Sequence, residues 1–284
     1  MPKAAFHTEN RFPSFVYLFS SALAIVAVTK SAIGAFFPEI FRDPPISAGN
    51  AQGTDIVILA VGIPALVISM ILTARGSWRA QIVWLGSLCY IFYNSVIFAF
   101  DTAFNPLFLL YVTTLSLSLW SILVLLIHFD VEKLRDRFTS KLPVKVFAIY
   151  MIILAGLFLF AWLSQIVPAL FEASRPIFLQ GTNMLTSPVH ILDLGFALPL
   201  VIISAAWLWQ RKSWGYLVSG ALLSMLTIET ASVAVDQVFG SLRDPSATMD
   251  AVPMFLVLTV VGLVVTVYYL RFLGLSSSQT VHPA

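Results

Sequence analysis

Long apolar runs, each of roughly 20 residues, alternate with short polar segments along almost the whole chain. A helix of that length rises 1.5 Å per residue and so matches the roughly 30 Å hydrocarbon core of a bilayer. The pattern therefore predicts an all-α, polytopic membrane bundle of about eight transmembrane helices, which forms a single transmembrane domain over residues 1–284. The predicted spans are 14–36, 55–73, 80–100, 107–128, 146–170, 188–208, 214–236 and 252–272.

The segments between these runs are expected to be loops. The stretch from Phe37 to Thr54 is rich in proline and glycine, which predicts that it is not helical throughout. The loop after the fifth span is expected to hold a short interfacial helix. The first run contains Lys30 and lacks a convincing cleavage site, so it is expected to be a retained span. No motif is shared by the two four-span halves, and an inverted repeat is not supported.

Composition supports a membrane protein and narrows its chemistry. The chain is 59% hydrophobic and only 11% charged, whereas soluble domains are about 25% charged. A formal net charge of +2 is too small to indicate nucleic acid as a partner. The single cysteine, Cys89, excludes an internal disulfide and any cysteine cluster for a metal or an iron–sulfur centre.

The basic residues are distributed unevenly between the two sides of the predicted bundle. Twelve lysines and arginines lie on the side of the two termini and three on the other side. This bias predicts that both termini are cytoplasmic, in the inner (plasma) membrane. One loop on that side holds five of them, which predicts contact with anionic lipid or a cytoplasmic protein; they are Lys133, Arg135, Arg137, Lys141 and Lys145.

Ionisable residues within the apolar runs mark a candidate site. The seventh span carries Glu229, Ser232 and Asp236, whose spacing of three, four and seven residues places them on one helical face. Insertion scales assign roughly 2.5–3.5 kcal/mol to a charge at mid-membrane, so such residues are functional hypotheses by default.

Other spans place polar residues at a similar depth, which predicts an outward-facing, net acidic site. The inner layer of this predicted site consists of Lys30, Asn94, Asp193 and Glu229, and the rim above it of Asp101, His190 and Asp236. Tyr90 lies on the same helical stripe as Asn94. We expect Lys30 to be the counter-ion of Asp193 or Glu229.

Structural roles are alternatives for most of these residues. The alternatives are a solvated helix end, a helix–helix hydrogen bond, simple packing, or snorkelling to the headgroups; they apply to Lys30, Tyr90, Asn94, Asp101, His190 and Asp236. Asp193 and Glu229 are the hardest to explain in this way because neither side chain is long enough to snorkel.

No GxSxG, HExxH, P-loop or dinucleotide fingerprint occurs, nor any haem or flavin signature. Of the four histidines only His190 reaches the polar layer, so a zinc enzyme is a weak interpretation. A divalent cation such as Mn²⁺, Mg²⁺ or Ca²⁺, held by Asp193, Glu229 and His190, would fit this set of ligands better.

Two segments, YIFYNSVIFAFDTAFNPLFLLYVTTLSLS and HILDLGFALPL, resemble stretches of uncharacterised bacterial multipass inner-membrane proteins of no assigned function. The resemblance implies a bacterial inner-membrane protein and supplies neither an activity nor the role of any residue.

Three classes of function remain open. The first is a transporter or channel-like protein whose acidic site binds a cation, a proton or a small cationic solute. The second is a sensor or accessory subunit that binds a ligand or lipid without moving it. The third is an intramembrane enzyme acting on a lipid, with carboxylates as acid and base. The first class accounts best for the net acidic layer.

Overall fold

A computed structural model describes residues 12–274, and its regular elements over that range are helical. Lys3 and Arg11, two of the twelve basic residues counted on the side of the termini, lie outside the described residues. Eight helices are long and apolar enough to cross a membrane, as the pattern predicts. They are α1 (Ser14–Phe36), α2 to α3 (Pro45–Ala74), α4 (Trp78–Phe100), α5 (Phe108–Ile127), α7 (Val144–Ala169), α8 to α9 (Pro188–Trp209), α10 (Ser213–Arg243) and α11 (Val252–Arg271).

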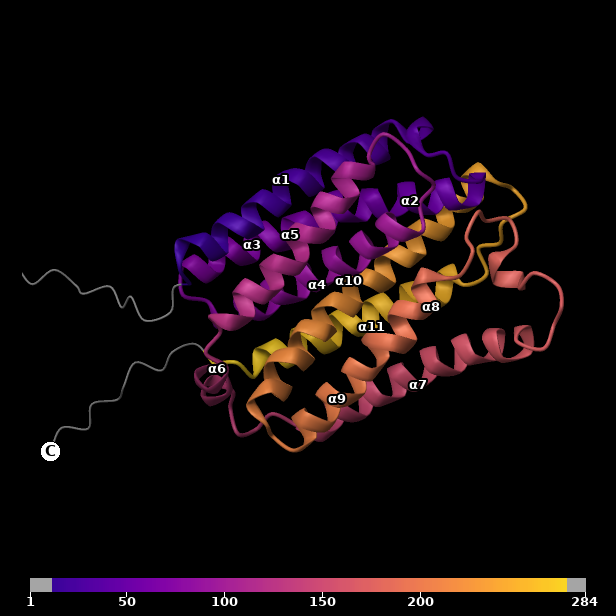
Figure 1. Ribbon diagram of the computed structural model, residues 1–284. Coiled ribbons are helices and arrows are strands. Elements are labelled where there is room, and N and C mark those ends of the chain that lie inside the picture. The colour runs from indigo at the N-terminus through magenta and orange to yellow at the C-terminus, as the bar shows by residue number, and fades with distance from the viewer. Residues whose placement is uncertain (1–11, 275–284) are drawn as a thin grey trace, which may run out of the picture.

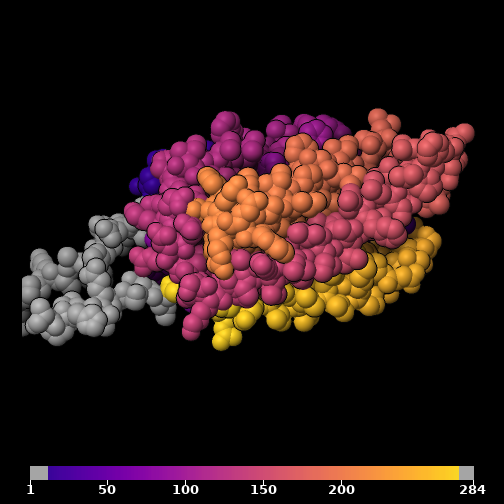
Figure 2. Space-filling view, turned by 90° about the horizontal axis from the view of Figure 1, so that it is seen from below, coloured from indigo at the N-terminus to yellow at the C-terminus, as the bar shows by residue number. Residues whose placement is uncertain are grey.

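The helices form one elongated bundle in which α4 and α10 lie side by side at the centre (Figure 1). Helices α1, α3 and α5 cover one side of this central pair, and α7, α9 and α11 cover the other. The space-filling view shows the outer face formed by α7, α9 and α11 (Figure 2). Large aliphatic side chains such as Ile153, Leu157 and Val260 are exposed on α7 and α11, and such surfaces are suited to lipid.

Short elements connect the spans. A 3₁₀ turn at Pro38–Ile40 follows α1, and a second at Ile177–Leu179 lies in the loop where a short interfacial helix was expected. The basic loop contains α6 (Val131–Arg137), which Asp130 caps by accepting a hydrogen bond from the backbone N–H of Lys133. Arg137 and Lys145 lie 5.5 Å and 5.4 Å from the rings of Trp78 and Trp209.

The second span begins ten residues earlier than predicted, at Pro45 rather than Asp55. Proline is tolerated in the first turn of a helix because no N–H is needed there. Gly49 and Gly53 then allow α2 to pack closely on α10: a Cβ on Gly53 would lie 2.7 Å from the Cα of Asp236. The residues that suggested a loop therefore form a helix–helix contact of the small-xxx-small type.

The seventh span also differs from its prediction, because α10 continues to Arg243 rather than ending at Asp236. Asp236 is thus two turns inside the helix and does not belong to the rim of the predicted site. Asp101 does lie at a helix end, as the residue that follows α4.

The two halves share no sequence motif, but the central part of the backbone, from the second to the third span of each half, recurs with a register of 135 residues. A π-helical turn begins at Ile58 and again at Asp193. The helices that follow it, Ile63–Ala74 (α3) and Leu198–Trp209 (α9), are both 12 residues long. Each then reverses through a residue with positive φ, Gly76 in the first half and Arg211 in the second. The next helices begin at Trp78 and Ser213.

Equivalent positions of the two halves meet at the centre of the bundle. Gly86 of α4 faces its equivalent Ala221 of α10, whose carbonyl oxygen would lie 2.7 Å from a Cβ at Gly86. Asn94 donates a hydrogen bond of 2.8 Å to its equivalent, Glu229. Contact between a residue and its own equivalent is the signature of a twofold relation. The halves run in the same direction, so this is a parallel repeat rather than an inverted one.

Both π-helical turns end two residues before a proline, Pro64 or Pro199. The proline ring would clash with the carbonyl group four residues earlier, at Ala60 or Gly195. A wider turn at this point relieves that clash, and π-bulges are frequent at functional sites.

Candidate functional site

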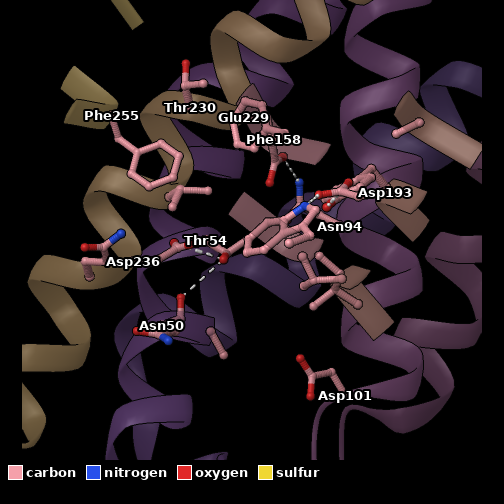
Figure 3. Close-up of a pocket in the computed structure, with 18 of the residues that line it drawn as sticks. Asn50, Thr54, Asn94, Asp101, Phe158, Asp193, Glu229, Thr230, Asp236 and Phe255 are labelled. Atoms are coloured by element: carbon pink, nitrogen blue, oxygen red, sulfur yellow. Dashed lines mark hydrogen bonds between the residues drawn. The ribbon is translucent and has the colours of Figure 1, made fainter. Parts of the chain in front are cut away.

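A pocket of about 500 Å³ opens near the end of the bundle opposite to the start of α1 and the end of α11. Its walls come from α2, α4, the second-half helices α7 to α11 and the loop that contains the 3₁₀ turn Ile177–Leu179. Figure 3 shows Glu229 and Asp236 on one wall, Asn94 and Asp193 beside Glu229, and Asp101 apart from them. The predicted residues that line the pocket are Asn94, Asp101, Asp193, Glu229 and Asp236.

Asp193 is held by two neutral donors. The hydroxyl of Tyr93 donates to its Oδ1 at 2.9 Å, and the indole Nε1 of Trp162 donates to its Oδ2 at 2.8 Å. The carboxylate is the first residue of the second π-helical turn, which directs it toward α4 and α7. Fixed donors on both oxygens stabilise a charged carboxylate in a set orientation.

Glu229 faces Asp193 across the turn of α4 that carries Tyr93 and Asn94. Its Oε2 accepts the hydrogen bond from Asn94, whose amide also donates to the backbone oxygen of Tyr90 at 3.1 Å. Among the described residues no donor is recorded for the other oxygen, Oε1, and Glu229 is only half-buried because it lines the cavity. This oxygen is therefore free to accept a hydrogen bond from a bound solute.

Asp236 is hydrogen-bonded to α2 about two helical turns beyond Glu229 on α10. The hydroxyl of Thr54 donates to Asp236 Oδ1 at 3.0 Å, which links the close α2–α10 contact directly to the pocket. Because Gly53 allows that approach, helix packing and the position of this carboxylate depend on each other.

Two further carboxylates, Asp43 and Asp101, lie at the mouth of the pocket, outside the spans. Asp43 Oδ1 accepts a hydrogen bond of 2.7 Å from the backbone N–H of Ala103. Burial raises the pKa of Asp43, although that hydrogen bond opposes the change. Burial, together with the nearby charge of Asp43, raises the pKa of Asp101 to about 6.

Most of the exposed lining is apolar, with rings contributed by Phe158, Trp162, Phe178 and Phe255, and neutral polar side chains such as Asn50, Gln180 and Gln237 complete it. Among the described lining residues there are five carboxylates and no lysine, arginine or histidine. A concave, mainly apolar cavity with a few convergent polar groups is the usual form of a small-molecule site. The sign of its charge favours a cation.

The predicted pairing of Lys30 with Asp193 or Glu229 is wrong. Lys30 does not line the pocket; its Nζ donates to Oδ1 of Asp55 at 2.6 Å, and both side chains are at most 2% exposed. Asp55 was missed because it fell on the boundary assigned to the second span. With α2 beginning at Pro45, Asp55 lies well inside the helix and needs a buried partner.

Two other predicted residues pack beside the pocket rather than lining it. Tyr90 is fully buried between α4 and α10 and donates to Ser232 Oγ at 3.2 Å. His190 lies between the rings of Trp162 and Phe178, with both centroids 4.7 Å from its own. Within residues 12–274 no group of three or more histidine, cysteine or acidic side chains could hold a metal ion. The metal set of Asp193, Glu229 and His190 is therefore not assembled.

Sequence reasoning also missed Asp43, Thr54, Tyr93 and Trp162. The first two fall in the segment assigned to a loop, and α2 brings Thr54 to the pocket. A signal was present for Tyr93, which adjoins Asn94 on the polar side of its span. No sequence signal pointed to Trp162, because its hydrogen bond to Asp193 depends on the packing of α7 beside α9.

No protein-family model, curated protein or solved structure matches this chain. The site's own geometry is therefore the basis on which its function is argued.

Proposed function

We propose that this membrane protein binds a small cationic solute in the pocket and moves it across the bilayer. The observation that carries the proposal is a lining with five carboxylates and no basic side chain among its described residues. Anions would be repelled by such a lining, whereas a cation gains from both the carboxylates and the aromatic faces. An intramembrane enzyme is less well supported because, among the described residues, no group of side chains that could hold a metal accompanies the carboxylates.

The proposed orientation has both termini in the cytoplasm and the pocket opening outward. It is supported by the basic residues, which cluster at the end of the bundle opposite the pocket. In this orientation Lys133, Arg135, Arg137, Lys141 and Lys145 face the anionic cytoplasmic leaflet or a cytoplasmic partner protein.

The parallel repeat formed by the two halves favours transport over binding alone. Parallel repeats related by an axis along the membrane normal are one of the architectures of secondary transporters, and their sites lie at the interface of the repeats. Here Asn94 and Glu229 meet at that interface and line the pocket. Helix irregularities at Ile58–Gly62 and Asp193–Ala197 flank it in both halves.

Thermal unfolding of the full-length protein in detergent tests the binding step. A panel of small organic cations and anions is added to wild type, to Glu229→Gln, and to the control Glu172→Gln, which removes an exposed carboxylate outside the pocket. We expect a cation to raise Tm in wild type and in the control but not in Glu229→Gln, because ligands that bind only the folded state stabilise it. No response to any cation, or an equal response to anions, would overturn the proposal.

Flux into proteoliposomes then separates the transporter from the sensor. The expected result is uptake of radiolabelled methylammonium that is lost in Glu229→Gln and retained in Glu172→Gln. Binding without uptake would replace transport by the second class of function, a sensor or accessory subunit.

A further inference from the structure

In the first half of the chain, the ammonium group of Lys30 is buried beside a carboxylate and aromatic rings. Its Nζ lies 2.6 Å from Oδ1 of Asp55, 3.2 Å from the ring centroid of Phe98 and 5.9 Å from that of Tyr111. These residues are almost completely buried. A carboxylate together with aromatic faces thus holds a primary ammonium inside the membrane domain.

Two aromatic-cage positions of the first half have counterparts on the wall of the pocket, one by the register and one by its place in the helix. The register of 135 residues relates Phe98 of α4 to Val233 of α10. Tyr111 and Phe255 are each the fourth residue of the last helix of their half, α5 or α11. Val233 and Phe255 both line the pocket.

The carboxylate of the second half lies on the helix equivalent to that of Asp55. The register itself relates Asp55 to His190, and Asp193 follows three residues later, on the same face of that helix. The register relates Lys30 to Gln165, and the residue of α7 that contacts Asp193 is Trp162, one turn away from Gln165 on that helix. The second half therefore combines a carboxylate and aromatic rings with an open cavity, whereas in the first half a lysine side chain occupies the site beside the carboxylate.

We infer that the solute is a primary alkylammonium, whose ammonium group binds among Asp193, Glu229 and the aromatic rings as Lys30 binds in its own cage. This inference rests on the proposed function and specifies its substrate class. The three N–H groups of an ammonium can donate to several acceptors at once, and Glu229 Oε1 has no recorded donor among the described residues. The alkyl chain then lies against apolar wall residues such as Leu154 and Phe158.

Other classes of ligand would interact with fewer features of the pocket wall. A quaternary ammonium has no N–H to donate to the carboxylates. An alkali cation gains nothing from the apolar wall, and a neutral alcohol has one O–H group to donate and no positive charge to balance the carboxylates.

Isothermal titration of the full-length protein in nanodiscs tests this ranking, with n-butylammonium, tetramethylammonium, sodium and n-butanol as probes. We expect n-butylammonium to bind about tenfold or more tightly than each of the others. If tetramethylammonium binds as tightly or more tightly, the inference is overturned and the proposed function stands. If none of the cations binds, the inference and the proposed function are both overturned.

Supplying the cation from the chain itself gives a sharper test. In Trp162→Lys a lysine on α7 would place its ammonium beside Asp193, as Lys30 lies beside Asp55. We expect this variant to lose n-butylammonium binding by about tenfold more than Trp162→Gln, the neutral control at the same position. Equal losses in the two variants would contradict the inference.

A second variant keeps the test decisive if Trp162→Lys does not fold, as judged by gel filtration and Tm. In Asp193→Asn the charge is removed with little change of shape, and we expect n-butylammonium to bind about tenfold more weakly. Glu172→Gln should bind it as wild type does. Unchanged affinity in Asp193→Asn would overturn the inference.

Discussion

Lys30 and Asp55 stabilise the protein only as a pair, because each alone would be an uncompensated charge in the interior. We expect Lys30→Met to lower the free energy of unfolding by about 3–5 kcal/mol, since Asp55 would remain buried without its counter-ion. The Asp55 side chain is fully buried, and its Oδ1 lies 2.6 Å from the Nζ of Lys30. Chemical unfolding in mixed detergent is the appropriate measurement.

The double variant Lys30→Met/Asp55→Asn is the matched control. It removes both charges, so it should recover much of the stability lost in the single variant. If the double variant is no more stable than Lys30→Met, the loss arises from packing around Phe98 and not from the unpaired charge.

Asp101, at the mouth of the pocket, should make the stability of the protein depend on pH. Its pKa is raised to about 6, first by burial and then by Asp43, so the folded state binds more protons than the unfolded state between about pH 4 and 6. Stability should therefore fall as the pH rises through that window. We expect the fall in Tm to be smaller in Asp101→Asn than in wild type, with Glu172→Gln resembling wild type. A profile unchanged in Asp101→Asn would contradict this.

The positions of side chains could be predicted from the sequence where helical periodicity alone determines them. The spacing of Glu229 and Asp236, and the depth of Asn94 and Asp193, singled out residues that line one cavity. Pairing was not predictable, because it depends on which helices are neighbours. Lys30 reaches Asp55 since α1 packs against α2, and no one-dimensional pattern contains that information.

The contact of helix α2 with α10 depends closely on residue size. A Cβ on Gly53 would lie 2.7 Å from Asp236 Cα, a backbone atom that cannot move away freely. We expect Gly53→Ala to lower the free energy of unfolding by about 1–3 kcal/mol, as overpacking does. It should also weaken cation binding, because Thr54 and Asp236 would be displaced together.

Gly156→Ala on α7 provides the comparison, since nothing lies within 4 Å of a Cβ added there. Alanine has a higher helix propensity than glycine, so this change should be neutral or stabilising by up to about 1 kcal/mol. Equal destabilisation by the two substitutions would show that the close approach of α2 to α10 is not what limits residue size at Gly53.

The eight spans were predictable because apolar length alone identifies them. The start of α2 and the internal repeat were not. Proline and glycine usually end helices, and only the proximity of α10 shows why they are accommodated here. The repeat is preserved in backbone geometry, and few identities mark it, among them Pro64 with Pro199 and Ser69 with Ser204.

The orientation of the whole molecule can be tested in intact cells. In a Cys89→Ser background, Glu172→Cys and Lys141→Cys place one exposed thiol at each end of the bundle. We expect a membrane-impermeant maleimide to label Glu172→Cys in intact cells and Lys141→Cys only after permeabilisation. The reverse pattern would invert the proposed topology and leave the bundle itself unchanged.

The contact of Asn94 with its equivalent Glu229 has a consequence for how such a protein can arise. In a dimer of identical halves the same side chain would face itself across the axis, and two carboxylates there would repel each other. Covalent fusion of the halves removes this constraint of identity, so that one copy can become an amide donor while the other remains an acid. An amide paired with an acid at equivalent positions, as at the centre of this bundle, is thus accessible to a single chain with two halves and not to a symmetric dimer of identical halves.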